Sequence, residues 1–264
     1  MKKSNDSGHV KNSAQFNEAV EYVSNIGTDY NPSNLQIQLV TLQAKGISLN
    51  TILDKLAKAE PVLKDAIYNR QNIYNNLDLY TAKAYNALCS SDVDYKFLSE
   101  AKSISKKILG SSKPKKKGEP PPEETEIILN SVVESEIVVN PEEETNRKSR
   151  STSQRGFDKR INNFSKFCYL LSNVPEYNPN EPELKISELN LFKVKVSESN
   201  ILAIKASNAM DDARLERDIQ FYTGKDNAYE TFKKVKSYIK SVYGTSSPKS
   251  KAISKLTFKL LKMN

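Results

Sequence analysis

The chain has no tryptophan, one histidine, two cysteines and only eight glycines among its 264 residues. So little glycine argues against many-turned β architectures and against the glycine-rich loops that approach phosphates closely. The lone histidine, His9, leaves no material for a histidine-based triad or a histidine-rich metal site. No P-loop, dinucleotide-binding fingerprint, nucleophile elbow or HExxH motif occurs. We therefore expect a protein that is not an enzyme and that binds no metal or cofactor.

Long apolar runs are also missing. No stretch approaches the roughly 18 consecutive apolar residues of a membrane span, and no apolar signal segment follows the first methionine. Cys89 and Cys168 lie one in each half of the chain at positions that do not match. We expect both to be reduced and mostly buried, the alternative being a disulfide between the two halves. These features predict a cytoplasmic protein without a membrane span.

The strongest positive signal is an internal repeat. The tripeptide Tyr-Asn-Pro at residues 30–32 recurs at 177–179, and Lys-Ser-Ile-Ser-Lys at 102–106 resembles Lys-Ala-Ile-Ser-Lys at 251–255. The two markers are 70 positions apart in the first copy and 72 in the second, counted from the proline to the first lysine. Ordered markers at matched spacing indicate a tandem duplication. The predicted repeats are residues 14–110 and 156–264.

Apolar residues recur at three- and four-residue spacing in both copies, which predicts an all-α fold. We expect four to five helices in each copy, packed as two tandem antiparallel bundles. Gly110 and Gly244 are well placed to end helices, and Pro61 is expected to break or kink the long apolar stripe around it. At the carboxyl terminus, the pattern fits a short helix that leads into an extended tail.

Two segments are expected to be disordered. Residues 1–13 form a polar tail, and the Pro- and Glu-rich residues 111–155 form a linker between the bundles. The linker nevertheless contains apolar clusters within an acidic frame. They either pack on one of the bundles or form a docking segment for a partner. The candidate docking residues are Ile127, Ile128, Leu129, Val132, Val133, Ile137, Val138 and Val139.

Charge is unevenly distributed along the chain, whose net charge is +8. Residues 1–110 contribute +2, residues 111–155 contribute −1 and residues 156–264 contribute +7. The basic carboxyl-terminal part either is ordinary solvated surface or attracts a polyanion such as nucleic acid, with tyrosines available to stack on bases. The candidate polyanion-binding residues are Lys233, Lys236, Lys240, Lys249, Lys251, Lys255, Lys259, Tyr238 and Tyr243.

The densest mixture of acids and bases lies at residues 211–218. Helical spacing places Asp211 beside Arg214, and Arg214 beside Asp218, so we expect a ladder of surface ion pairs there. Arg70 aligns roughly with Arg217 of the second copy, which would also suit a buried contact.

Several of these motifs resemble a group of duplicated helical hypothetical proteins of Bacteroidetes, especially flavobacteria. The resemblance rests on the Tyr-Asn-Pro turn, on the entry Ser-Thr-Ser-Gln at 151–154 with Phe157, Asp158, Arg160, Asn163 and Phe164, and on residues 235–244. It implies a bacterial source and a duplicated architecture, and it brings no activity and no site residues.

The sequence thus predicts a non-enzymatic interaction or scaffold protein, in which two tethered helical bundles engage an unknown protein partner. The alternative is sequence-independent binding of nucleic acid, or of another polyanion, through the basic carboxyl-terminal half. No feature of the sequence indicates an oligomeric state.

Overall fold

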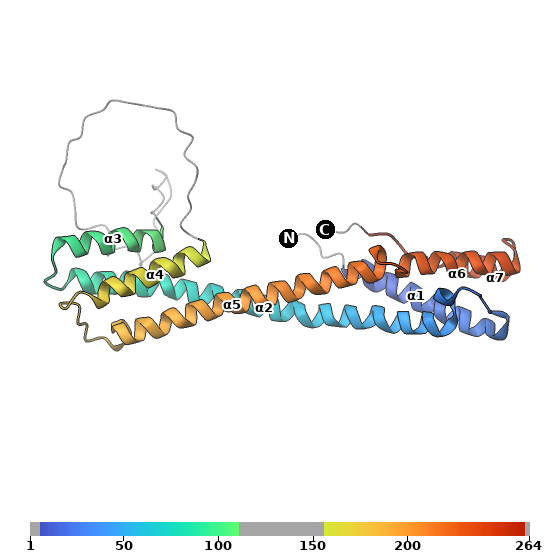
Figure 1. Ribbon diagram of the computed structural model, residues 1–264, viewed down its shortest axis with the longest axis horizontal. Helices are drawn as coiled ribbons and strands as arrows, with labels where there is room; N and C mark the ends of the chain where they lie inside the picture. Colours follow the sequence, from blue (N-terminus) through green and yellow to red (C-terminus); the bar gives the residue numbers. More distant parts are fainter. Residues whose placement is uncertain (1–5, 111–155, 262–264) are drawn as a thin grey trace, which may run out of the picture. The chain divides into compact units, whose positions relative to one another are not determined.

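The computed structural model describes residues 6–110 and 156–261. This part of the chain is all-helical, as predicted: helices make up 82% of it, and none of its residues lies in a strand. Figure 1 labels the longer elements along the chain. The first half holds α1 (Asp6–Ile26), η1 (Gly27–Asp29), η2 (Leu35–Ile37), α2 (Leu39–Cys89) and α3 (Tyr95–Leu109). The second half holds α4 (Phe157–Ser172), η3 (Pro182–Leu184), α5 (Ile186–Asp218), the π-helix η4 (Ile219–Thr223), α6 (Ala228–Tyr243) and α7 (Pro248–Lys255).

Local signals set the ends of α3 and α6. The side chains of Asp94 and Asn227 each accept a hydrogen bond of 2.9 Å from a backbone N–H of the first turn. Gly110 and Gly244 follow the last helical residues with φ angles of 85° and 79°. Glycine occupies this region without the steric cost that a side chain would add. Both predicted helix stops are confirmed.

Helix α2 continues through Pro61, so the predicted break is not found. Proline removes one backbone donor and leaves the carbonyl of the residue four positions earlier without its helical partner. Pro61 and Ala57 are both exposed, so water can bond to that carbonyl. At the carboxyl terminus, α7 is followed by the non-helical residues 256–261, as predicted.

The helices form two compact units. The first unit comprises the described residues of Met1–Tyr74 and Ser197–Asn264, and the second comprises those of Asn75–Val196. In the first unit, α1 lies against α6, although the two helices come from opposite ends of the chain (Figure 1). Its core gathers buried side chains of α1, α2, η4, α6 and α7. They include Phe16, Val23, Leu49, Phe221, Phe232, Ile239 and Ile253.

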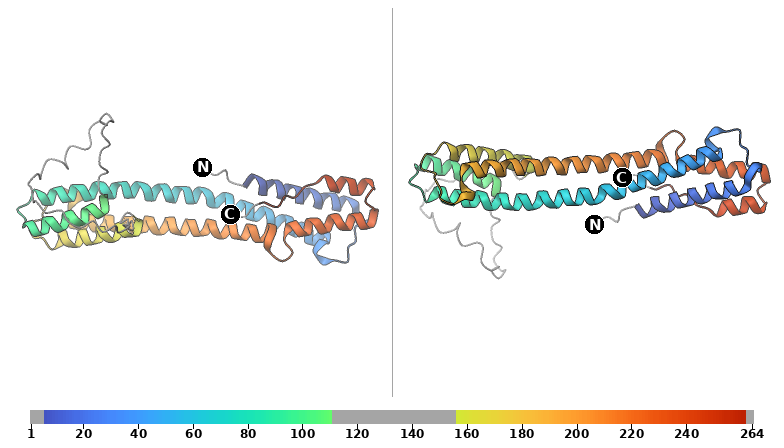
Figure 2. Two further views of the ribbon diagram at one scale, coloured as in Figure 1. Left: turned by 90° about the horizontal axis from the view of Figure 1, so that it is seen from above. Right: turned by 90° about the horizontal axis from the view of Figure 1, so that it is seen from below.

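The second unit is built around the contact between α3 and α4, which Figure 2 shows side by side from two further directions. Buried residues on these helices include Ile104, Ile108, Phe164 and Phe167. The end of α2 and the beginning of α5 complete this unit.

These units are not the two predicted tandem bundles, residues 14–110 and 156–264. Each unit takes the beginning of one repeat and the end of the other. The physical reason is the length of α2, whose 51 residues extend about 75 Å, whereas the 21 residues of α1 extend only about 30 Å. Over this length α2 packs with helices of both repeats: in the first unit its Leu49 shares a core with Phe16 of α1 and Phe232 of α6.

The predicted linker does not connect the two units. Residues 111–155 lie outside the described residues, but the positions on either side of them, Gly110 and Gly156, both belong to the second unit. The stretch therefore joins two helices of one unit. The chain passes between the units along α2 and α5 instead.

The amino-terminal prediction of a disordered tail over residues 1–13 is wrong for residues 6–13, because α1 begins at Asp6. Three polar residues of this first part, His9, Asn12 and Ser13, are buried. They find partners far along the chain, such as Tyr222 for His9 and Asn50 for Ser13. Buried polar groups are tolerated when they are hydrogen-bonded, which explains how a polar segment became part of the core.

Candidate functional site

The predicted basic residues all lie in the first unit. Lys233, Lys236 and Lys240 are on α6, whereas Lys249, Lys251 and Lys255 are on α7. Lys259 is in the extended tail that follows α7. Helices α6 and α7 pack against each other, so the structure brings the first six lysines onto one helical hairpin.

Lys236 holds this hairpin together. Its Nζ donates hydrogen bonds to the carbonyl oxygens of Ser254, at 3.3 Å, and Leu256, at 2.5 Å, where α7 ends. The same atom lies 5.0 Å from the centre of the Phe232 ring. Burial lowers the pKa of Lys236, and the neighbouring positive charge of Lys240 lowers it further. Lys236 is therefore engaged within the fold.

Two further lysines of the predicted set are paired with acids. Lys233 lies 3.1 Å from Glu230 on the same helix, and Lys249 lies 3.7 Å from Asp29. The Nζ of Lys249 also stands 4.2 Å from the centre of the Tyr243 ring. These contacts neutralise part of the positive charge of the predicted polyanion-binding surface.

The two tyrosines of the predicted set are half-buried. Tyr238 meets Tyr30 edge to face, with the ring centres 5.1 Å apart. Tyr243 is covered by Lys249, and its hydroxyl lies 3.5 Å from the carbonyl oxygen of Asp29. Neither ring is presented to solvent as the open stacking platform that the sequence suggested.

Four lysines remain exposed: Lys240, Lys251, Lys255 and Lys259. Within residues 6–110 and 156–261, their ammonium groups make no hydrogen bond or ion pair. The backbone of Lys259 is fixed, because Asn12 accepts a hydrogen bond from its N–H at 2.9 Å and donates one to its carbonyl oxygen at 2.7 Å. We call these four side chains the free lysines.

The acid and base cluster at residues 211–218 forms ion pairs, as predicted. Asp211 and Arg214 lie 3.2 Å apart in solvent. Arg217 and Asp218 lie 2.8 Å apart with side chains only 11% and 15% exposed, so this pair is largely shielded from solvent. The predicted pair of Arg214 with Asp218 is replaced by the one with Arg217. No group of three or more potential metal ligands occurs in the described part of the chain.

A buried polar cluster was missed by sequence reasoning. The hydroxyl of Tyr222, on the π-helix η4, lies 3.0 Å from Nδ1 of His9 and accepts a hydrogen bond from Asn12, also at 3.0 Å. Burial raises the pKa of Tyr222. No sequence signal could have paired these residues, since more than 200 positions separate them.

The cysteines are only partly as predicted. Both are free, but Cys168 is buried on α4 whereas Cys89, the last residue of α2, is exposed. Burial raises the pKa of Cys168 to about 12. The exposure of Cys89 follows from its position at a helix end.

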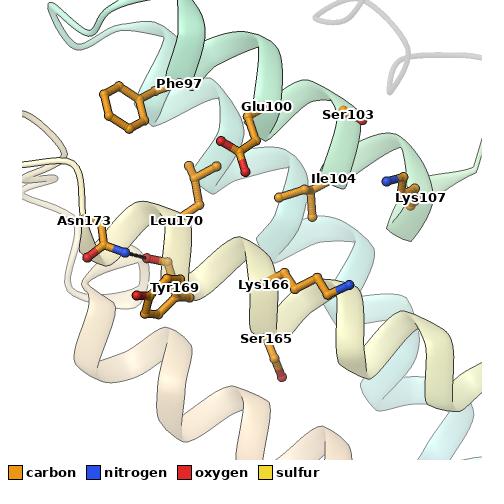
Figure 3. Close-up of a pocket in the computed structure, with 10 residues that line it drawn as sticks. All are labelled: Phe97, Glu100, Ser103, Ile104, Lys107, Ser165, Lys166, Tyr169, Leu170 and Asn173. Atoms are coloured by element: carbon orange, nitrogen blue, oxygen red, sulfur yellow. Dashed lines mark hydrogen bonds between the residues drawn. The ribbon is translucent and has the colours of Figure 1, made fainter.

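The second unit contains a groove between α3 and α4, with a volume of about 610 Å³. Figure 3 shows Ile104 and Leu170 between the two helices, with Lys107 and Lys166 toward one end. The remaining lining residues are Phe97, Glu100, Ser103, Ser165, Tyr169 and Asn173. The predicted docking segment of residues 127–139 lies outside the described residues.

In the first unit, large apolar side chains are exposed where α2 and α5 pair. Arg70 donates a hydrogen bond of 3.4 Å to the side-chain oxygen of Asn200, which fixes the level at which the helices meet. Within one turn of this bond lie four apolar residues whose exposed fractions range from 41% to 70%. We call this set the apolar patch: Ile67, Tyr68, Ile201 and Leu202.

The fold and these surfaces define an all-helical protein with two helical units. Comparisons with models of protein families, with curated proteins and with solved structures find no match. Among the described helices, none is both long enough and apolar enough to cross a membrane.

Proposed function

We propose that the protein is a non-enzymatic interaction protein that binds a protein partner through the apolar patch on α2 and α5. The observation that supports this proposal is the exposure of Ile67, Tyr68, Ile201 and Leu202 at one level of a helix pair. Several large apolar side chains exposed close together suit an interaction surface better than single scattered ones do. The hydrogen bond between Arg70 and the buried Asn200 joins the two helices that carry these side chains.

This part of α2 and α5 contributes little to the buried apolar core of the first unit. A separate buried cluster on the same two helices is small and contains Leu56, Met210 and Ala213. Two paired helices bury one stripe each, so apolar side chains on other faces stay in water until a further helix or sheet covers them. A partner would supply that cover.

A photo-crosslinking residue at position 68 tests this proposal in the native cell. We expect it to capture a defined protein, and we expect Leu202→Lys to abolish the capture because it puts a charge into the apolar contact. The same crosslinker at Tyr95, which is 81% exposed in the other unit, is the matched control and should not capture that protein. Equal capture from both positions, or capture that survives Leu202→Lys, would refute the proposal.

A second candidate function is binding of a polyanion, and the specific observation in its favour is the set of free lysines. Each phosphate contact of a single strand contributes about −0.7 to the slope of log affinity against log salt, so four contacts would give a slope of about −2.8. Lys236 is hydrogen-bonded within the fold, and the rings of Tyr238 and Tyr243 contact other side chains. The main attraction for a nucleic acid would therefore be electrostatic. Binding would thus be independent of sequence.

Replacing the four free lysines by glutamine should remove this binding at low salt. The control replaces four exposed lysines elsewhere, Lys58, Lys96, Lys102 and Lys106, and changes the net charge equally. A mobility-shift titration with a single-stranded oligonucleotide compares the two variants. If both lose binding alike, only the net charge matters and the assigned surface is wrong.

The proposal includes a cytoplasmic location. Its support is the pair of free cysteines, one of them exposed, which suits a reducing compartment. No cofactor has a role in either candidate function.

A further inference from the structure

The groove between α3 and α4 has the character of a peptide-binding site. Its floor is apolar, with Ile104 and Leu170 buried and Phe97 half-buried beside them. One end carries two exposed lysines, Lys107 and Lys166, as Figure 3 shows. Apolar side chains that carry acidic neighbours would match both features.

The 45 residues at positions 111–155 lie between α3 and α4 in the sequence, so they connect the two helices that form the groove. Within this stretch, residues 118–146 contain nine glutamates and neither lysine nor arginine. The same interval holds the apolar residues of segment 127–139. The apolar residues of this segment therefore match the apolar floor, and its glutamates match Lys107 and Lys166, although Glu100 of the lining is itself acidic. The segment is attached to the two groove helices at both ends.

From this complementarity, we infer that residues 127–139 of the same chain occupy the groove between α3 and α4. Their apolar side chains lie on Ile104, Leu170 and Phe97, and their flanking glutamates face Lys107 and Lys166. This inference is independent of the proposed function, which concerns another surface in the other unit.

The distances permit this contact. Residue 127 is 17 positions beyond Gly110, so the intervening chain can extend to about 55 Å. The groove follows α3 from Phe97 to Lys107, a rise of only about 15 Å. A tether of this length gives an effective concentration on the order of millimolar, so even a segment with weak intrinsic affinity stays bound.

Attachment also favours this occupant over a separate protein. A free partner with the same contacts must reach the groove from solution, where its concentration is far below the effective concentration of the tethered segment. A partner could enter only by binding more tightly than the tethered segment does.

Tyr169 offers a reporter position for the test. It lines the groove, is 73% exposed, and its side chain makes no hydrogen bond within the described residues. Because the chain has no tryptophan, Tyr169→Trp introduces a fluorophore without background. We expect its emission maximum to lie at a shorter wavelength in the full chain than in a variant whose eight apolar residues at 127–139 are replaced by serine.

The control places the tryptophan at Tyr95, which is on α3 outside the groove and 81% exposed. Its emission should be the same with and without the serine replacements. The buried thiol of Cys168 should stay protected from a thiol reagent in all variants, which verifies that the unit is folded. Equal emission of the Tyr169→Trp reporter in both backgrounds would overturn the inference.

Dilution identifies the source of the segment. The shift persists on dilution if the segment belongs to the same chain, whereas loss of the shift would assign it to a second copy and overturn the inference. A synthetic peptide of residues 119–144, added to the serine variant, should restore the shift. The double substitution Lys107→Glu with Lys166→Glu should lower the affinity of this peptide for the groove by about two- to thirtyfold, because two ion pairs at the rim become repulsive.

Discussion

Tyr30 and Tyr177 make the same hydrogen bond in the two repeats. The hydroxyl of Tyr30 donates to the carbonyl oxygen of Ile37 at 2.7 Å, and that of Tyr177 donates to the carbonyl oxygen of Leu184 at 2.9 Å. In both cases the acceptor is seven positions after the tyrosine and is the last residue of a three-residue 3₁₀ helix. Each bond closes the Tyr-Asn-Pro turn that leads into a long helix.

Removing either hydroxyl should destabilise the protein. We expect Tyr30→Phe and Tyr177→Phe each to lower the free energy of unfolding by about 1–3 kcal/mol, because a buried carbonyl loses its partner. Urea denaturation followed by circular dichroism measures the change. Tyr95→Phe is the control, since Tyr95 is exposed, and it should leave the unfolding curve in place. Unchanged curves for both buried tyrosines would show that these bonds contribute nothing.

The same two tyrosines predict a loss of stability in alkali. Burial raises the pKa of Tyr30 and of Tyr177 above the ordinary value of 10. Above about pH 10 the unfolded chain therefore releases phenolic protons that the folded chain retains, and the free energy of unfolding falls as the pH rises. Below pH 10 both states keep these protons and the contribution is constant. Cys168, whose pKa burial raises to about 12, acts in the same direction from its ordinary value of 9 upward.

Urea denaturation at a series of pH values from 8 to 11 checks this expectation. The double variant Tyr30→Phe with Tyr177→Phe should lose less stability over that interval than the unaltered chain does, because it lacks the two groups whose pKa is raised. Parallel pH profiles of the two proteins would count against this assignment.

Individual helices were predictable from the sequence because their signals are local. Gly110 and Gly244 end α3 and α6 where the pattern placed them, since a left-handed backbone at a helix end needs no distant partner. The grouping of helices was not predictable in this way. The apolar stripe of α2 indicates that one face of this helix is buried. It does not indicate which repeat supplies the helices that bury it.

The candidate site residues show the same contrast between local features, which the sequence predicts, and contacts with distant residues, which it does not. The positions of the lysines on α6 and α7 followed from spacing, but the carbonyl groups that engage Lys236 come from another helix. The sequence suggests that Tyr238 is available to stack on bases, whereas its ring packs on Tyr30, 208 positions earlier. His9 was assigned to a tail because its neighbours are polar, and Tyr222 provides the contact that buries it.

The two thiols should react at very different rates. Cys89 is exposed and should react with a thiol reagent in the native protein, whereas Cys168 is buried and its raised pKa disfavours the reactive thiolate. We expect one fast equivalent at neutral pH and a second that appears only in denaturant. In Cys89→Ser the fast equivalent should disappear. Two fast equivalents would mean that α4 opens readily.

Asn12 should anchor the extended tail that follows α7. Its side chain makes two hydrogen bonds to the backbone of Lys259, while that of Gln15 accepts one from the N–H of Thr257 at 2.8 Å. Each lost bond is worth about 1 kcal/mol, so Asn12→Ala should speed amide exchange in residues 256–261 more than Gln15→Ala does. Hydrogen exchange read by mass spectrometry compares the two variants. An equal effect of both would contradict the unequal number of bonds.

The interleaved origin of the two units has a consequence for the order of events on the ribosome. The second unit, Asn75–Val196, is one continuous stretch and can assemble as soon as its last residue has emerged. The first unit begins before the second along the chain, yet it is incomplete until Ser197 and the helices after it have been made. We therefore expect the second unit to complete its fold before the first, against the usual sequence in which amino-terminal domains form first. Among the described helices, α1 is made first, and α6, against which it packs, is made only after the whole second unit.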